Sequence, residues 1–397
     1  SIKTAGFTAA NGEGYFCNTN GGIFTVTLPA GAAGNIVAIA DYTRTFNTNN
    51  LTVTPDGSEK IGGVAASATL NVDGQSATFV YVDSTEGWVN VQETQTSQTG
   101  TPPFIAATGG TPCAGATSGD YRYHTFTGPG TFCVSRLAPG PSGNPNNVDY
   151  LVVAGGAGGG SGYGAGGGAG GYRESVPSPA AWTASPIANP GGARPVSVQG
   201  YPIVVGAAGT AGSDNNEAGG AGGVSSFSDI PSAGGGGGGS EGSAALAGGS
   251  GGGAGYDLTG GSGDTPPTSP AQGFDGGDGG TAPAYGAGGG GGASEVGESV
   301  PNPAVAGAGG DGVTTCISAT PTARTGGGGG GGGSPSPPYT PGAGGAGGGG
   351  AGAAGGPGNT GTAGTINTGS GGGGGNNQCK QGGLGASGLV ILRYKFQ

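Results

Sequence analysis

The sequence has little charge, almost no histidine and no methionine. Charged residues make up 8% of the 397 residues, and His124 is the single histidine. Because no run of about 20 apolar residues occurs, no membrane insertion is expected. The formal net charge is −11 without a basic patch, so no nucleic-acid partner is expected. The chain opens at Ser1 and lacks methionine, and we expect it to be processed or part of a longer polypeptide, with no signal peptide left to read.

Motifs for catalysis and for metal or nucleotide binding are also missing. The sequence has no P-loop and no HExxH zinc motif, and matches to GxGxxG are unavoidable in so glycine-rich a chain. His124 stands in "YRYHTFT" and is interpreted as a strand residue, since no nucleophile elbow accompanies it. The stretch 252–259 resembles one calcium-binding repeat, but Thr259 replaces a large apolar residue and such repeats work in tandem. We therefore predict no enzyme, no cofactor and no metal site.

The five cysteines include no CxxC pair. Cys17, in "GYFCNT", is predicted to be a small buried hydrophobic residue. Cys113 and Cys133 flank a predicted hairpin, and Cys316 and Cys379 lie in separate turns, so each pair is a candidate disulfide. Either bridge would indicate an extracellular protein.

Glycine is what the sequence has in abundance. Gly and Pro supply 106 and 28 residues, about a third of the chain, a share typical of disorder. Two features argue against disorder: the low charge, and the alternation of glycine runs with apolar, strand-like segments. The glycine runs recur near 155–171, 206–223, 233–255, 286–293, 325–334, 342–358 and 369–375.

Few ordered conformations suit such runs. Their spacing breaks the strict period of collagen, an α-helix costs about 1 kcal/mol per glycine, and a bare glycine sheet has no side chains to pack. A left-handed helix with three residues per turn needs no Cβ, and several can pack side by side. We therefore predict that 151–388 is a lattice of such polyglycine-II helices with loops at its ends. The strand in "YLVVAG" should pair with the strand in "GLVILRY" and clamp the region.

The predicted fold class is mainly β plus irregular structure, with almost no α-helix. Residues 1–96 are predicted to be a sandwich-like attachment or spacer domain, because short alternating strands are separated by turn signals, including a hairpin with Trp88 on its return strand. Residues 97–105 are a predicted linker. Residues 106–150 are a predicted short β unit with a hairpin formed by "YRYHTFT" and "TFCVS", and 151–397 the glycine-rich domain, closing on a C-terminal strand.

These motifs resemble known families. The segments "GYFCNTNGGIFTVTLPAG", "GNIVAIADY", "NNLTVTPDGSEKIGG" and "QSATFVYVDSTEGWVNVQ" resemble a small β domain of tail-fibre proteins from marine, notably cyanobacterial, phages. The segments "YRYHTFTGPGTFCVS", "VDYLVVAGG", "YPIVVGAAG" and "GLVILRY" are similar to the glycine-rich module that follows it. In composition, the glycine region also resembles polyglycine-helix tip adhesins of tailed phages and the glycine-rich domain of anaplastic lymphoma kinase.

The resemblance implies where a binding surface would lie. In the phage adhesins distal loops contact the host receptor, and 256–285, 294–305 and 335–341 would be the corresponding loops. Aromatic rings stack on sugars, and carboxylates bind hydroxyl groups or cations. For the aromatic residues of these loops, and for Tyr163 and Trp182, the alternative role is to cap the ends of the lattice. For the acidic residues, the alternative is that they are simply solvated. The candidate receptor-binding residues are Tyr256, Asp257, Phe274, Asp275, Asp278, Tyr285, Glu295 and Tyr339.

Three functions remain open at this point. The first is a non-enzymatic virion fibre or adhesin that binds a host cell-surface glycan or protein. The second is a self-assembling extracellular or capsid-attached filament protein without a receptor of its own. The third is a glycan depolymerase with paired carboxylates, which no elongated β-helix supports. The first two predict a virion-surface or extracellular location, contacts with other virion or filament subunits, and a homo-oligomer (a trimer or a fibre).

Overall fold

The computed structural model describes residues 1–92, 104–138, 146–176, 180, 182–213, 216–283, 285–302, 305–333, 340–356, 358–377 and 380–396. These residues form strands, turns and extended segments without any helix, which confirms the predicted mainly β fold. In the described part of the chain, therefore, no helix is long and apolar enough to cross a membrane. The chain divides into two compact units, Ser1–Phe104 with Ala138–Asn144 and Ile105–Leu137 with Pro145–Gln397. Most of the predicted linker, 97–103, lies outside the described residues.

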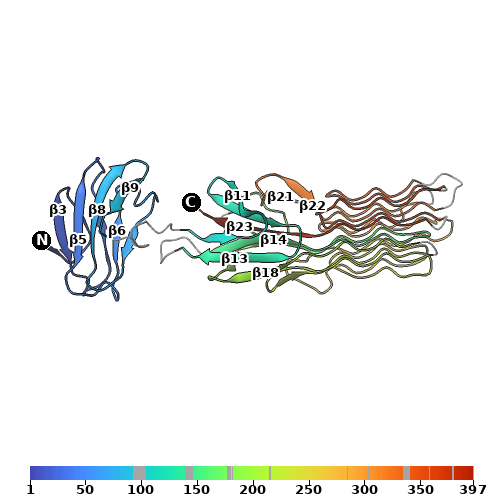
Figure 1. The fold of residues 1–397 in the computed structure, drawn as a ribbon. Coiled ribbons are helices and arrows are strands. Elements are labelled where there is room, and N and C mark those ends of the chain that lie inside the picture. The colour runs from blue at the N-terminus through green and yellow to red at the C-terminus, as the bar shows by residue number, and fades with distance from the viewer. Residues whose placement is uncertain are drawn as a thin grey trace. The chain divides into compact units, whose positions relative to one another are not determined.

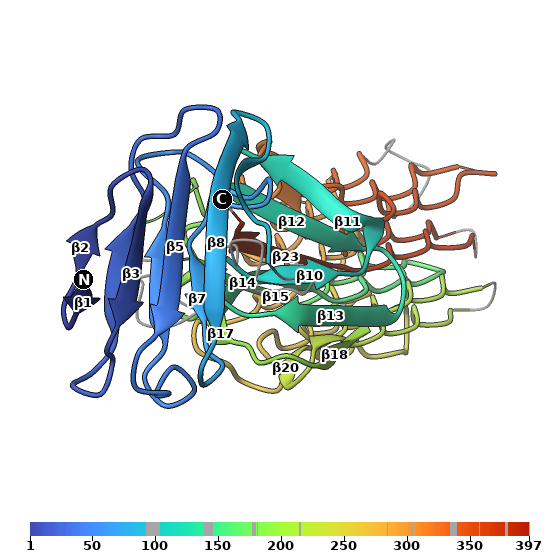
Figure 2. The ribbon, with the colours of Figure 1, turned by 60° about the vertical axis from the view of Figure 1, so that its left-hand side comes forward.

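The first unit contains two sheets (Figures 1 and 2). One sheet has the order β1-β3-β5-β8-β9, built from Ile2–Lys3, Glu13–Cys17, Ile36–Asp41, Ser76–Asp83 and Gly87–Asn90. The other has the order β2-β4-β6-β7, built from Phe7–Thr8, Phe24–Thr27, Leu51–Thr54 and Ala68–Leu70. Alternate residues of both sheets point to one apolar core that contains Val26, Ile39, Leu51, Phe79 and Trp88.

The chain passes from one sheet to the other as it forms this sandwich. Strands β1, β3 and β5 are parallel to one another, as are β2, β4 and β6, and antiparallel β7, β8 and β9 complete the sheets. The predicted sandwich and the hairpin carrying Trp88 are confirmed. Cys17 is fully buried, as predicted for a core residue, and burial raises the pKa of its thiol to about 12.

Two further sheets begin the second unit. The first runs β11-β12-β23-β14-β15-β16, from Thr111–Ser118, Tyr121–Phe126, Leu389–Lys395, Asn147–Val153, Tyr172–Val176 and Asn189–Pro190, with β17 (Arg194–Pro195) beside β14. The second runs β10-β13-β18-β19-β20, from Ala106–Thr108, Gly130–Arg136, Gly200–Val204, Ser225–Phe227 and Ile230–Ser232. The short hairpin of β21 (Val313–Thr315) and β22 (Thr322–Arg324) is a separate two-stranded sheet.

The clamp predicted from the two apolar segments is confirmed. Strands β14 and β23 pair antiparallel, with Leu151 opposite Ile391 and Val153 opposite Leu389. Both strands are buried on both faces, which explains their continuous apolar sequence.

The predicted hairpin of β12 and β13 is wrong. Strand β12 pairs with β11 and β23, whereas β13 pairs with β10 and β18 in the other sheet. The "GPG" segment turns the chain between two sheets, so that Phe126 and Phe132 enter one core from opposite sides. Residues 106–150 consequently do not form a unit of their own but share one with the glycine-rich region.

Glycine-rich segments run back and forth from these sheets and together form what we call the glycine lattice, within 154–388 (Figure 1). In segment 154–161 the amide donors change partner with a period of three. Residues 155, 158 and 161 donate to 223, 220 and 217; residues 156 and 159 donate to 386 and 383; residues 157 and 160 donate to 168 and 165. None of the glycines in this segment has a φ between +20° and +160°. Three residues per turn with negative φ define the predicted left-handed polyglycine-II helix.

Segment 164–171 shows how backbone amides and carbonyls in the lattice interior find hydrogen-bond partners. Its eight amides donate to three neighbours, within 233–239, 288–291 and 369–375. Its carbonyls accept from three others, at 157 and 160, 250 and 253, and 328 and 331. Six neighbours around one helix leave no room for side chains: a Cβ on Gly167 would lie 2.3 Å from the carbonyl oxygen of Ala157.

Segment 206–212 shows the edge of the lattice. Gly206, Gly209 and Gly212 are buried, while Ala207, Ala208, Thr210 and Ala211 project to solvent or are only half-buried. At an edge, one glycine in three is enough, because the other two positions face outward.

Candidate binding end of the glycine lattice

The lattice has one end at the sheets and one end away from them. Segment 154–161 leaves β14 and segment 164–171 enters β15, so the turn between them lies at the far end (Figure 1). Tyr163 stands in this turn with a φ of 52°, and Gly162 before it has a φ of 54°. Two consecutive left-handed residues reverse the chain within the width of two adjacent helices.

Three tyrosines from separate parts of the sequence meet at the far end. The ring centroids of Tyr163 and Tyr256 are 6.3 Å apart, those of Tyr163 and Tyr285 6.3 Å, and those of Tyr256 and Tyr285 5.1 Å. Each tyrosine is half-buried. We call them the distal tyrosine cluster; the structure brings together two of the predicted binding tyrosines and adds Tyr163.

Acidic residues lie near this cluster, among them Glu217, whose backbone carbonyl accepts from the Ser161 amide at 2.9 Å. Asp257 follows Tyr256 and is exposed. The Glu241 amide donates to the Gly162 carbonyl at 3.2 Å, which places Glu241 beside the Tyr163 turn. Glu217 accepts from the Ser213 amide at 3.1 Å and from the Ser213 hydroxyl, and these bonds lower the pKa of its carboxyl. This end can therefore offer aromatic faces together with hydrogen-bond acceptors.

The other predicted acidic residues lie elsewhere. Residues 256–285 are not one loop, because 258–263 and 273–280 are lattice segments. Within them the Gly263 amide donates to Asp275 Oδ1 at 2.7 Å, and the Gly260 amide donates to Asp278 Oδ1 at 2.9 Å. At the edge of the lattice these carboxylates replace the carbonyl of a missing neighbour.

Glu295 and Phe274 are also separated from the cluster. Glu295 accepts from the Asp311 amide at 3.3 Å, another edge contact. Phe274 is half-buried near the sheet end, where its amide donates to the Gly292 carbonyl. Tyr339 lies outside the described residues.

The cysteines do not form the bridge considered for the first pair. Cys113 and Cys133 are free and exposed, on strands β11 and β13 of different sheets. They cannot flank a hairpin, since β12 and β13 do not form one. Cys316 is half-buried, and its candidate partner Cys379 lies outside the described residues.

A buried polar group at the sheet end, centred on Glu174, is not predicted from the sequence. Glu174 accepts from the Tyr172 hydroxyl at 2.9 Å, the Ser185 amide at 3.0 Å and the Thr315 hydroxyl. Trp182, predicted to be a loop aromatic, is buried here and directs its Nε1 to the same carboxyl group at 3.5 Å. These contacts fix the β21–β22 hairpin to β15. The weak signal was the polar "RES" in β15, directly after a glycine run.

Two more buried charged residues, Asp149 and Arg393, lie opposite each other on the paired strands β14 and β23. The Arg393 guanidinium lies between the rings of Tyr121 and Trp182, at 4.5 and 4.6 Å, and donates to the Ile317 carbonyl at 3.1 Å. Asp149 accepts from the Ser175 hydroxyl at 3.0 Å. Burial raises the pKa of Asp149 to about 6, against the opposing effects of Ser175 and Arg393.

His124 is a strand residue, as predicted. It lies in β12, fully buried, with Nδ1 2.7 Å from the Gly109 carbonyl and Nε2 3.2 Å from the Tyr394 hydroxyl. Burial lowers the pKa of its imidazole. In the described part of the chain, no three His, Cys, Asp or Glu side chains are grouped so as to hold a metal ion.

A family model described as a glycine-rich domain matches residues 136–395, about two thirds of the chain. The match covers the glycine lattice, its β14–β23 clamp and the buried polar groups at the sheet end. No curated protein matches the chain.

Proposed function

Because this chain belongs to the glycine-rich domain family, we propose that its lattice is a rigid support that displays a binding surface. The protein is a non-enzymatic virion fibre or adhesin, located on the virion surface, whose far lattice end binds a host cell-surface glycan or protein. The sequence resemblance to marine phage tail fibres supports the virion assignment.

The distal tyrosine cluster is the observation that carries this proposal. Tyr163, Tyr256 and Tyr285 come from distant parts of the sequence, yet their rings are in contact at one end. Capping alone would bury them, whereas each stays partly accessible beside exposed Asp257. Accessible aromatic rings next to hydrogen-bond acceptors suit a saccharide, whose ring stacks while its hydroxyls donate.

The lattice supplies what such a surface needs. Binding geometry is held best on rigid elements, and each interior helix is hydrogen-bonded to six neighbours. The turns therefore keep their positions without a large side-chain core beneath them.

A binding assay tests this proposal. Fluorescently labelled full chain is incubated with intact cyanobacterial cells and with a glycan array. Tyr256→Ala and Tyr285→Ala should each reduce binding at least about tenfold, the range of an interface hot spot. Leu384→Ala is the control, since Leu384 is exposed on the lattice flank and should bind like wild type. Equal binding by all variants would exclude the cluster as the receptor site.

The second candidate is a self-assembling filament without a receptor. The side-by-side packing of the lattice helices supports it. Electron micrographs of the purified chain would show filaments, and the chain would bind neither the cells nor the array. The depolymerase candidate has less support, because Asp275, Asp278 and Glu295 accept backbone amides along the lattice edge.

A further inference from the structure

One outer face of the first unit has no charged side chain at the outward strand positions within residues 1–92. It is the solvent side of the sheet β1-β3-β5-β8-β9, where residues alternate with those of the core. Several of its apolar side chains are exposed, among them Phe16 at 53% and Val91 at 59%. Its outward positions are Ile2, Gly14, Phe16, Ile36, Ala38, Ala40, Ser76, Thr78, Val80, Val82, Val89 and Val91. We call this surface the uncharged face.

The opposite face of the same sandwich is very different. The outward positions of the sheet β2-β4-β6-β7 are threonines, paired across the strands as Thr8, Thr27 and Thr54 in one row and Thr25, Thr52 and Thr69 in the next. This is an ordinary polar face for an antiparallel or mixed sheet in water. The apolar character of the uncharged face therefore does not follow from the fold.

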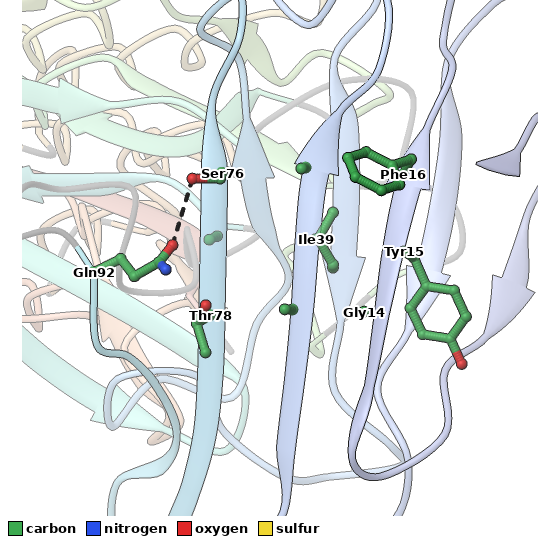
Figure 3. Close-up of a pocket in the computed structure, with 10 residues that line it drawn as sticks. Gly14, Tyr15, Phe16, Ile39, Ser76, Thr78 and Gln92 are labelled. Atoms are coloured by element: carbon green, nitrogen blue, oxygen red, sulfur yellow. Dashed lines mark hydrogen bonds between the residues drawn. The ribbon is translucent and has the colours of Figure 1, made fainter. Parts of the chain in front are cut away.

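A hollow of about 210 Å³ lies in the uncharged face (Figure 3). The hollow exists because the side chains at Gly14, Ala38 and Ala40 are absent or small. Ser76 and Gln92 lie along one side, where the Ser76 hydroxyl donates to Gln92 Oε1 at 3.4 Å. A cavity of about 150 Å³ is known to hold a benzene molecule. The hollow therefore has room for one aromatic side chain.

The same face supplies such a side chain. Phe16 stands at the margin of the hollow, in edge contact with Tyr42 at 6.3 Å. A projecting ring beside a hollow is self-complementary, because a two-fold axis brings the ring of each copy to the hollow of the other.

Charge limits where two copies can meet. Residues 1–92 contain seven acidic and three basic side chains, a net charge of −4. Two copies would repel each other across most of their surfaces, and contact through the uncharged face avoids placing like charges together. A strongly basic partner would instead favour the acidic parts of the unit.

We propose that the uncharged face is covered by the same face of a second copy of this chain, with Phe16 of each copy in the hollow of the other. This pairing does not require receptor binding by the distal tyrosine cluster.

The mass of the full chain in solution tests the proposal. Sedimentation equilibrium of wild type should give about twice the chain mass of 36.5 kDa. Ala38→Arg places a charge on the floor of the hollow and should give the single-chain mass. Thr25→Arg, the matched control on the threonine face, should keep the double mass. A wild-type mass other than two chains, or an unchanged mass for Ala38→Arg, would overturn the proposal.

A cross-linking experiment avoids dependence on the folding of Ala38→Arg. A photoreactive benzoylphenylalanine is incorporated at position 16 and, as control, at position 25. Irradiation should produce cross-linked pairs only from position 16, with attachment to peptides containing Ala38, Ala40, Ser76 or Thr78 of the other copy. Pairs from both positions, or from neither, would contradict the pairing.

Discussion

Side chains fill the core of the first unit, whereas backbone atoms fill the core of the lattice. In the sandwich, Phe79 and Trp88 are fully buried among other apolar side chains. Segment 164–171, by contrast, is surrounded mainly by the carbonyls and amides of six adjacent helices. The sandwich is thus stabilised mainly by removing apolar surface from water. The lattice gains little of this and relies on satisfying nearly every buried amide.

The two kinds of core should fail in opposite ways. A sandwich core is damaged when a side chain is removed, because a cavity remains. A lattice core is damaged when a side chain is added, because no space exists.

The largest effect is expected for Gly329→Val. An added Cβ would lie 2.1 Å from the carbonyl oxygen of Gly342, a backbone atom that cannot move without breaking lattice hydrogen bonds. We expect the free energy of unfolding of the second unit to fall by more than about 4 kcal/mol, beyond most point mutations. Trp182 fluorescence in a Trp88→Phe background follows this unit, since the chain has one tryptophan in each unit. A loss below about 1 kcal/mol, or rapid amide exchange throughout 164–171 in wild type, would refute the packed lattice.

A smaller effect is expected for Phe79→Ala in the sandwich. Removing this buried ring should lower the stability of the first unit by about 3–4 kcal/mol. Trp88 fluorescence in a Trp182→Phe background gives the measurement. Trp182 fluorescence of Phe79→Ala in a Trp88→Phe background follows the second unit, which should melt as before; a shift of this transition as well would show that the units do not unfold independently.

The next effect is a dependence of the stability of the second unit on pH, through Asp149. The folded pKa of Asp149 is raised to about 6 from 3.8, so its protonated form is favoured in the folded state. The stabilisation that protonated Asp149 gives to the folded state is fully present below pH 3.8. It is lost as pH rises through 6, which lowers the free energy of unfolding by up to about 3 kcal/mol.

Asp149→Asn isolates this contribution from that of other carboxyl groups. The difference in stability of the second unit between wild type and the variant should change between pH 4 and pH 7, with wild type losing relative stability as pH rises. A difference that is constant over this range would show that the Asp149 pKa is not raised.

The smallest effect is expected for Ala208→Val at the lattice edge. Ala208 is exposed on segment 206–212, so the added methyl groups enter solvent. The change in stability should stay within about 0.5 kcal/mol, the usual range for surface positions. Together with Gly329→Val, this variant separates interior from edge positions; a loss like that of Gly329→Val would mean that segment 206–212 is covered.

Much of this architecture can be predicted from the sequence because the two cores leave different patterns. Alternating apolar residues indicate the sandwich, and the apolar ends at Tyr150 and Leu389 indicate the clamp between β14 and β23. The absence of side chains in the long runs leaves the polyglycine-II helix as the ordered conformation.

Other features depend on positions that the sequence does not encode locally. The "GPG" segment indicates a turn, but not whether the strands on either side remain in one sheet. Glycine runs are nearly identical to one another, so nothing in them specifies which helices become neighbours. The meeting of Tyr163, Tyr256 and Tyr285 depends on that order, as does the use of Asp275 and Asp278 as edge acceptors. The sequence therefore indicates that tyrosines and aspartates occur between the glycine runs, but not which of them lie together in the folded lattice.

Strand β23 has a consequence for how the second unit is made. It occupies the middle of its sheet, between β12 and β14, although both of those strands are synthesised more than 230 residues earlier. Until Leu389–Lys395 has left the ribosome, β12 and β14 lack their shared neighbour. The glycine-rich segment is then anchored to a sheet at its start, by β14, but not yet at its finish, by β23. Closure of this unit must therefore wait for the synthesis of Leu389–Lys395, and the long glycine segments have to stay unassociated with other chains in the meantime.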